Sequence, residues 1–285
     1  MSAAMSTPHS QRGTALIIAL LVLAIAAAAA AAMIESQDLQ QRALQAERDA
    51  EQARWLLRGG MHWARSILAE DARSGSEDHQ RELWASGLPP TDVQLGSLAG
   101  EIRDEQALFN LNNLMRGGKI SPPHVAALSR LLAALGRRAE LADAIAAAMD
   151  PSRPLADLAE LAGMRAMDPD TLARLQRYAT ALPRPTPVNV NTAPPEVLVA
   201  VVEGLTLPEA QELSRRLATE PVRRPEEFQA RLRKGLSFNP EDLSVGSQFF
   251  LVNGRAKVGG SELRMQALLQ RGGVALPAIV WQRAS

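Results

Sequence analysis

The chain has 285 residues, of which 46% are apolar, and its 31 Lys and Arg residues balance its 31 Asp and Glu residues. This apolar content is enough for one large or two modest cores, and zero net charge excludes a long-range field that would attract nucleic acid or a charged surface. The lack of cysteine excludes disulfides, thiolate nucleophiles and cysteine-ligated zinc or iron–sulfur sites.

A short polar stretch with a positive charge at Arg12 precedes twenty residues, 15–34, that carry no polar side chain. As a helix this segment is about 30 Å long and can cross the hydrocarbon core of a bilayer. Residues 26–32 are all alanine, which gains less from lipid than leucine does, so the anchor is weakly held. A cleaved secretory signal would have a shorter apolar core and a small-residue cut site, whereas an ordinary signal anchor remains an alternative.

The helical pattern continues beyond the apolar segment. Small or apolar residues recur in steps of three and four from Leu39 to Leu68, which is one face of a helix. No proline occurs between Pro8 and Pro89, and Ser74-Gly75 is the predicted stop, so we predict one helix of about 57 residues. The alternative is a membrane anchor followed by a coiled-coil stalk, although the many alanines on this face would give only weak packing between the helices of a coiled coil.

The segment from Gln11 to Leu21 resembles the prepilin leader of type IV pilins and type II secretion pseudopilins. The resemblance implies that a membrane peptidase cuts between Gly13 and Thr14 and that Thr14 becomes methylated. Most family members have glutamate at the fifth mature position, where this chain has Ile18. That carboxylate needs a partner inside the bilayer, which in pilins is the amino group of a neighbouring subunit. Ile18 therefore fits the first subunit of a filament, or a helix that never enters one.

The C-terminal region predicts antiparallel strands. Apolar and polar residues alternate from 262 to 269, and diglycines at 259–260 and 272–273 bracket this segment. Apolar runs at 249–252 and 278–281 lie on either side, so two hairpins are predicted.

Between 114 and 237, proline and glycine separate a series of short helices, with prolines at first turns such as Pro122, Pro169 and Pro225. Residues 96–113 carry only a weak strand signal. We predict an α+β fold in which a pilin-like long N-terminal helix packs on an antiparallel sheet and a large helical domain is inserted into the sheet domain. The predicted units are a leader (1–13), a transmembrane half-helix (14–34), an amphipathic half-helix (35–73), a sheet domain (74–113 and 238–285) and the inserted helical domain (114–237).

Residues 187–198 resemble the start of a helix-hairpin-helix unit, with Glu203-Gly204-Leu205 in the hairpin position. Such units hold a phosphate on backbone amides backed by basic residues. Here Pro208 has no backbone N–H to donate to a phosphate. Residues 185–240 contain seven basic and seven acidic residues, so this segment has no net charge. We therefore predict a packing scaffold or protein-contact surface, and keep a membrane-tethered helix-hairpin-helix DNA-binding protein as the alternative function.

Four motifs, in this order, carry a wider resemblance: Asp104-Glu105-Gln106, Phe109 to Asn112, Pro187 to Leu198, and Ser247 to Phe250. They resemble the general secretion pathway protein K family, the large minor pseudopilin of type II secretion, over nearly the whole mature chain. The resemblance implies a pilin-like domain with a helical insertion, no fifth-position glutamate, and a place at the pseudopilus tip with minor pseudopilins of the I and J types, then the H type.

Relatives of this family bind calcium, commonly with an acidic loop after the helix that corresponds to 141–149. The equivalent loop here, 150–154, has one carboxylate, Asp150, whereas calcium takes six to eight oxygens. Calcium is thus implied by resemblance and opposed by the loop, and no cofactor is predicted from the residues. The acidic pairs Asp104-Glu105 and Glu241-Asp242 could serve a calcium site elsewhere, but they are expected to be solvated surface.

The sequence thus predicts a minor pseudopilin that forms the pseudopilus tip and initiates its assembly for protein export. The expected location is the inner membrane of a Gram-negative bacterium, single-pass, with the bulk in the periplasm. Expected partners also include the prepilin peptidase and exoprotein cargo or the outer-membrane channel, but no nucleic acid. No nucleophile elbow, phosphate loop or histidine metal motif occurs, so neither an enzyme, a catalytic residue nor a metal site is predicted.

Overall fold

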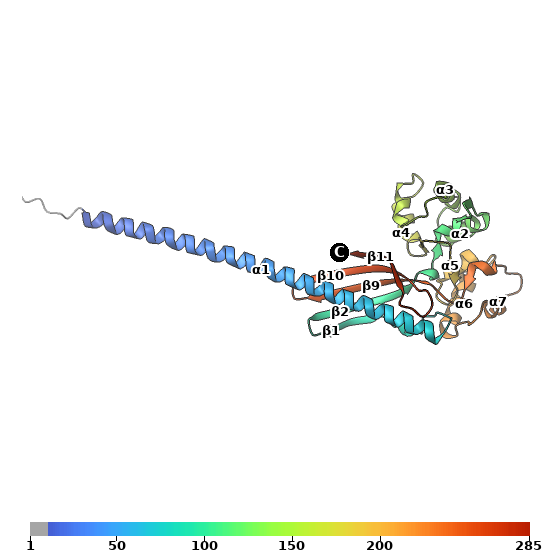
Figure 1. The fold of residues 1–285 in the computed structure, drawn as a ribbon. Coiled ribbons are helices and arrows are strands. Elements are labelled where there is room, and N and C mark those ends of the chain that lie inside the picture. Colours follow the sequence, from blue (N-terminus) through green and yellow to red (C-terminus); the bar gives the residue numbers. More distant parts are fainter. Residues whose placement is uncertain (1–10) are drawn as a thin grey trace, which may run out of the picture.

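The computed structural model describes residues 11–285, beginning within a single helix, α1 (Gln11–Ser74), of 64 residues. At 1.5 Å per residue this helix is about 96 Å long. The prediction of one unbroken helix ending at Ser74 is confirmed, and the helix passes through Gly59 and Gly60 without interruption. In Figure 1 its first half projects away from the rest of the molecule, while its second half lies along the sheet.

Five antiparallel strands form the sheet, in the order β1-β2-β9-β10-β11. Their bounds are Leu88–Val93 (β1), Gly96–Asp104 (β2), Phe249–Val258 (β9), Ser261–Gln270 (β10) and Ala278–Ala284 (β11). The two predicted C-terminal hairpins are confirmed. Strand β1 was not predicted because it contains Pro89 and Pro90, which a strand tolerates when it lies at the edge of a sheet, as β1 does.

The second half of α1 covers one face of this sheet, and the predicted small-or-apolar stripe supplies the contact. The core between them contains Ala53, Leu57, Met61, Ala64, Leu68, Trp84, Phe250, Val252, Ala256, Val258, Met265, Ala267 and Leu269. A Cβ on Gly254 of the central strand would lie 3.2 Å from Leu57 Cδ2, so this glycine lets helix and sheet approach closely. Trp84 and Phe250 stack edge to face, with ring centroids 5.3 Å apart.

The chain between β2 and β9 forms a helical unit at the end of the sheet farthest from the projecting half of α1 (Figure 1). Its α-helices are α2 (Pro122–Ala134), α3 (Leu141–Ala148), α4 (Pro169–Leu175), α5 (Pro195–Val201), α6 (Leu207–Thr219) and α7 (Pro225–Arg231). Short 3-10 helices are Leu83–Ser86 (η1, before the sheet), Glu105–Ala107 (η2), Leu111–Leu114 (η3), Leu158–Gly163 (η4) and Pro240–Asp242 (η5). Two-residue strands complete it: Phe109–Asn110 (β3), Met115–Arg116 (β4), Lys119–Ile120 (β5), Ala179–Thr180 (β6), Val188–Asn189 (β7) and Leu243–Ser244 (β8). The predicted helix starts at prolines are confirmed.

This helical unit extends beyond its predicted limits of 114 and 237. Phe109, Leu111 and Leu243 belong to its hydrophobic core, and β7 pairs with β8 through Val188 and Leu243. The flanking segments therefore pack with the helices and not with the sheet. Strands of two residues are too short to show a period of two, which is why the sequence pattern placed these boundaries incorrectly.

Candidate functional site

The N-terminal half of α1 exposes a continuous apolar surface. The large apolar side chains from Leu16 to Ile34 are between 56% and 67% exposed, and every residue from 14 to 48 is exposed within the described part of the chain. An eighteen-residue window here has a mean hydropathy of 2.9. The length and composition of this segment suit a bilayer span.

The predicted processing residues lie at the start of this segment. Gly13 and Thr14 are both inside α1, and the side chain of Ile18 is 60% exposed. Residues 1–10 of the predicted leader lie outside the described residues. Cleavage between Gly13 and Thr14, and methylation of Thr14, stay predictions.

A buried carboxylate joins the sheet to the helical unit. Asp104, the last residue of β2, accepts hydrogen bonds at Oδ2 from Asn189 Nδ2 (2.9 Å), Thr192 Oγ1 (2.6 Å) and Ser247 Oγ (2.7 Å). Its Oδ1 accepts from the backbone N–H of Gln106 at 2.8 Å. Burial raises the pKa of Asp104, and these hydrogen bonds oppose that rise. Three of the four motifs that carried the family resemblance therefore meet on one side chain.

The expectation that the acidic pairs are solvated surface is wrong for Asp104-Glu105. Glu105 is also buried and accepts a hydrogen bond from Thr180 Oγ1 at 2.7 Å, and burial raises its pKa. The error arose because the short helix η2 turns these two neighbouring side chains toward the interior. In the second pair, Asp242 accepts from His124 Nε2 (3.1 Å) and Arg116 Nη2 (2.9 Å). Both acidic segments thus have structural partners.

A second charged cluster, not predicted from the sequence, lies beside Asp104. Arg271, which follows β10, donates from Nη1 to Asp71 Oδ2 at 2.6 Å and from Nη2 to both Asp78 Oδ2 and the carbonyl oxygen of Ser247. The backbone N–H of Ser247 also donates to Asp78 Oδ2, at 2.6 Å. Burial raises the pKa of Asp78 to about 7, and the charge of Arg271 opposes this.

Arg271 therefore connects the end of α1, the loop after it and the motif before β9. Its guanidinium also lies 4.8 Å from the centre of the Phe250 ring. No local pattern predicts this arrangement, because Asp71 and Arg271 are separated by 200 residues in sequence.

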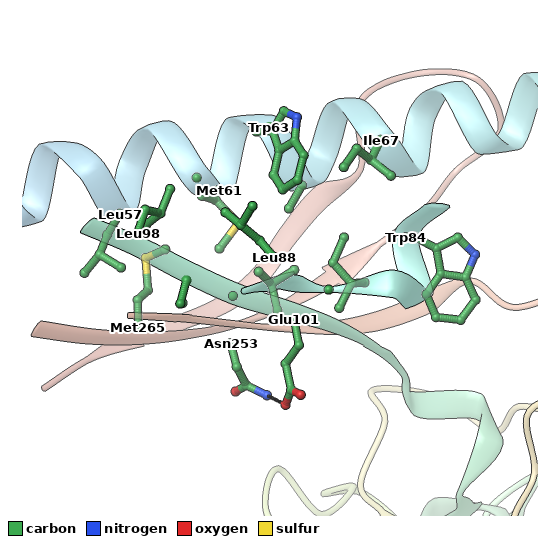
Figure 2. Close-up of a pocket in the computed structure, with 18 of the residues that line it drawn as sticks. Leu57, Met61, Trp63, Ile67, Trp84, Leu88, Leu98, Glu101, Asn253 and Met265 are labelled. Atoms are coloured by element: carbon green, nitrogen blue, oxygen red, sulfur yellow. Dashed lines mark hydrogen bonds between the residues drawn. The ribbon is translucent and has the colours of Figure 1, made fainter. Parts of the chain in front are cut away.

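An apolar cavity of about 40 Å³ lies between α1 and the edge of the sheet (Figure 2). Its lining includes Met61 and Trp63 of α1, Leu88 of β1 and Leu98 of β2. Glu101, the ionisable residue in the lining, accepts a hydrogen bond from Asn253 Nδ2 at 2.9 Å. The cavity is too small for a metabolite and lacks a convergent set of ionisable groups, so it is best described as a packing gap.

In the segment that resembles a helix-hairpin-helix unit, α5 and α6 are joined by a turn in which Gly204 has a φ of +79°. A carboxylate occupies the start of α6, where Glu209 Oε2 accepts from the backbone N–H of Thr206 (3.0 Å) and from Thr206 Oγ1 (2.8 Å). Arg233 donates to Glu209 Oε1 at 2.6 Å and to the Gly204 carbonyl at 3.0 Å. The Thr206 hydrogen bond and Arg233 lower the pKa of Glu209 to about 2. The Thr206 N–H and the Arg233 guanidinium, two groups that could hold a phosphate here, are thus already paired within the chain.

The loop at which the family resemblance implies calcium does not fit that ion. Asp150 is exposed, and its Oδ1 accepts from the backbone N–H and the hydroxyl of Ser152 at 2.8 and 2.7 Å. The neighbouring Arg153 pairs with Glu160 at 2.8 Å. One carboxylate beside a cation is too few anionic oxygens for calcium.

Comparisons with known proteins agree on one family. The family models described as type II secretion system (T2SS), protein K match residues 107–184 and 188–246, which lie within the helical unit. Type II secretion system protein K of Pseudomonas aeruginosa (strain PAO1) is 30% identical, over 93% of this chain and 90% of that protein. Type II secretion system protein K of Klebsiella pneumoniae is also 30% identical, over 93% of this chain and 94% of that protein.

Among solved structures, the fold is similar to a chain in the crystal structure of the GspK–GspI–GspJ complex from the type 2 secretion system of enterotoxigenic Escherichia coli. The TM-score is 0.63 at 22% identity, covering 85% of this chain and 98% of that one. This likeness supports the α+β fold of a long helix, a sheet and a helical insertion.

Proposed function

The chain belongs to the type II secretion system protein K family, and on this premise we propose that it is a minor pseudopilin that forms the tip of the pseudopilus and initiates its assembly. The anchor is the N-terminal part of α1, crossing the inner membrane once, and the sheet and helical unit lie in the periplasm. The observation that carries the proposal is the division of α1 into an exposed and a packed half.

The exposed half of α1 is longer than a membrane needs. Residues 14–48 are exposed, and Asp49 is the first buried residue after them. These 35 exposed positions extend over about 52 Å, whereas the hydrocarbon core is about 30 Å thick. The remaining turns carry apolar residues such as Leu39 and Leu44, and helices of neighbouring subunits are the surfaces that suit them.

Two features support a place at the tip. The helical unit lies at the end of the molecule opposite to the projecting half of α1 (Figure 1). We propose that in a filament it would take the space that a further subunit needs. Ile18 offers no carboxylate to the amino group of a preceding subunit, and a first subunit has no such neighbour. By analogy with the GspK–GspI–GspJ complex, whose fold is similar, we propose partners of the I and J types. The resemblance to the family adds a partner of the H type.

Cysteine crosslinking tests these contacts directly, because the chain has no cysteine of its own. The full chain with Leu44→Cys, produced together with I-type and J-type pseudopilins that carry single cysteines in their N-terminal helices, should form disulfide-linked heterodimers on mild oxidation. Ser152→Cys, on an exposed loop of the helical unit, is the matched control and should not crosslink. Equal crosslinking at both positions, or none at Leu44→Cys, contradicts the proposed helix contacts.

Processing by the prepilin peptidase is tested by the mass of the N-terminal peptide from cells with an active peptidase. The expected peptide begins at methylated Thr14. A chain that begins at Met1, or one that is cut near Glu35, would contradict the proposed pathway.

The alternative of a DNA-binding protein finds little support in the hairpin geometry, because Glu209 and Arg233 pair with each other and with the backbone there. A titration of the full chain with duplex DNA at several salt concentrations decides between the two functions. Affinity that falls steeply with salt would support the alternative.

A further inference from the structure

Three carboxylates converge where α1 ends and the loop toward η1 begins. Asp71 lies in the last turn of α1, and Asp78 and Glu82 follow in the loop. One carboxylate oxygen from each of the three lies within 4.8 Å of the others. Two oxygens that bind the same Ca²⁺ can be separated by up to about twice the metal–oxygen distance of 2.3–2.6 Å. The three carboxylate oxygens are therefore close enough together to bind one ion.

The hydrogen bonds found among residues 11–285 occupy one oxygen of each carboxylate. Arg271 takes Oδ2 of Asp71 and of Asp78, while the backbone N–H of His79 (2.9 Å) and the indole N–H of Trp84 (2.7 Å) donate to Oε2 of Glu82. The other oxygen of each group remains available as a ligand. These protein donors also hold the three carboxylates in place, as the supporting contacts of a metal site do.

Asp78 provides the independent sign of a missing ligand. Its side chain is fully buried, yet Oδ1 has no hydrogen-bond donor among the described residues. Leaving a buried carboxylate oxygen unpaired is unfavourable, because the oxygen has lost its water and no other group replaces it. A bound cation would supply the missing interaction.

The charges of the cluster point to a divalent cation. Asp71, Asp78 and Glu82 together carry three negative charges when ionised, and Arg271 contributes one positive charge. The difference is two negative charges, which one divalent cation neutralises. Carboxylate oxygens are the ligands that hard cations such as Ca²⁺ and Mg²⁺ prefer.

We propose that Asp71, Asp78 and Glu82 bind one hard divalent cation at the junction of α1, the sheet and the helical unit. The ion would join the last turn of α1 to the loop that Ser247 and Asn189 contact, and so would fix how the helical unit sits on the sheet. The site is separate from loop 150–154 and does not depend on the proposed place at the pseudopilus tip.

Terbium luminescence is the most direct test, because Tb³⁺ replaces hard cations and is sensitised by a nearby indole, here that of Trp84. The detergent-solubilised full chain, first treated with a chelator, should show Trp-sensitised Tb³⁺ emission that saturates and is displaced by Ca²⁺ or Mg²⁺. Glu82→Gln and Asp71→Asn keep the shape of the side chain and an acceptor oxygen, and each should weaken binding at least about tenfold.

Two control variants locate the ion. Asp92→Asn removes an exposed carboxylate on β1, and Asp150→Asn removes the one in loop 150–154; neither should change the emission. Circular dichroism spectra of all variants confirm that each is folded. If Asp150→Asn abolishes binding while Glu82→Gln does not, the ion lies in the loop and the proposal fails. The proposal also fails if Tb³⁺ emission is absent and Glu82→Gln raises the thermal unfolding temperature. That result would mean that the three carboxylates repel one another without a cation and that a proton, not a metal ion, reduces their charge.

Discussion

The side-chain amide of Asn189 donates a 2.9 Å hydrogen bond to the carboxylate of Asp104 and so links the helical unit to the end of strand β2. The same amide lies 3.0 Å from the backbone carbonyl of Asp78 and 3.1 Å from Ser247 Oγ. Both side chains are buried, so the interaction is shielded from water. Residues of three of the four motifs that suggested the family are therefore structural residues of the junction.

Replacing Asn189 by alanine should lower the free energy of unfolding by about 1–3 kcal/mol, because the buried Asp104 carboxylate loses a donor that no water replaces. Chemical denaturation of the full chain in detergent measures the change. Asn253→Ala is the control, since it removes an exposed hydrogen bond to Glu101 and should change the stability by less than about 0.5 kcal/mol. If the two substitutions lower the free energy of unfolding equally, the buried position of the Asn189–Asp104 hydrogen bond does not increase its contribution to stability.

The two halves of α1 should respond differently to the same substitution. Leu57 is 3% exposed and packs on the sheet, whereas Leu44 is 54% exposed. Leu57→Ala should destabilise the isolated chain by about 2–5 kcal/mol because it leaves a cavity, while Leu44→Ala should leave its stability within about 0.5 kcal/mol. In the assembled complex Leu44→Ala should instead reduce the recovery of partner subunits. Loss of isolated-chain stability on Leu44→Ala would contradict the assigned packing.

Because Glu105 is buried, we expect the stability of the fold to depend on pH in a defined direction. Burial raises its pKa above the ordinary value of 4.5, so the folded state binds this proton more tightly than the unfolded state does. The stability contributed by this group is therefore lost as pH rises from 4.5 through the raised pKa. Glu105→Gln removes the titration and keeps an acceptor for Thr180, so the variant should gain stability relative to the unmodified chain as pH rises.

Chemical denaturation of both proteins at a series of pH values, from about pH 4.5 to about pH 8, measures the difference in their free energy of unfolding. The other buried carboxylates are present in both proteins, so their contributions to this difference cancel. A difference that stays constant over the range would mean that Glu105 has the same pKa in the folded and unfolded chain.

Long, strongly periodic segments could be predicted from the sequence. The unbroken α1, the C-terminal hairpins and the proline-started helices depend on local patterns, and the structure confirms them. Strand β1 was missed because prolines suppress the strand signal, although at a sheet edge they are tolerated.

The polar junction could not be predicted in the same way. Asp104 meets Asn189 across 85 residues, and Arg271 meets Asp78 across 193. A single sequence carries no signal for such pairs, and Asp104-Glu105 looks locally like an ordinary solvated acidic pair. The family motifs pointed to the right residues of this junction but not to their partners Asp71, Asp78 and Arg271.

Substitutions at Ile18 test whether this chain is the first subunit of the filament. Ile18 lies in the apolar span, and Ile18→Glu would put a carboxylate into the bilayer, at a cost of about 2.5–3.5 kcal/mol near its centre unless a partner is present. A first subunit has no preceding amino group to pair with it, so Ile18→Glu should reduce the recovery of I-type and J-type subunits with the full chain from solubilised membranes. Ile18→Leu keeps the apolar character and should leave recovery unchanged. Stronger assembly with Ile18→Glu would mean that an amino group of another subunit lies beside position 18, and the chain would then not be the first in its filament.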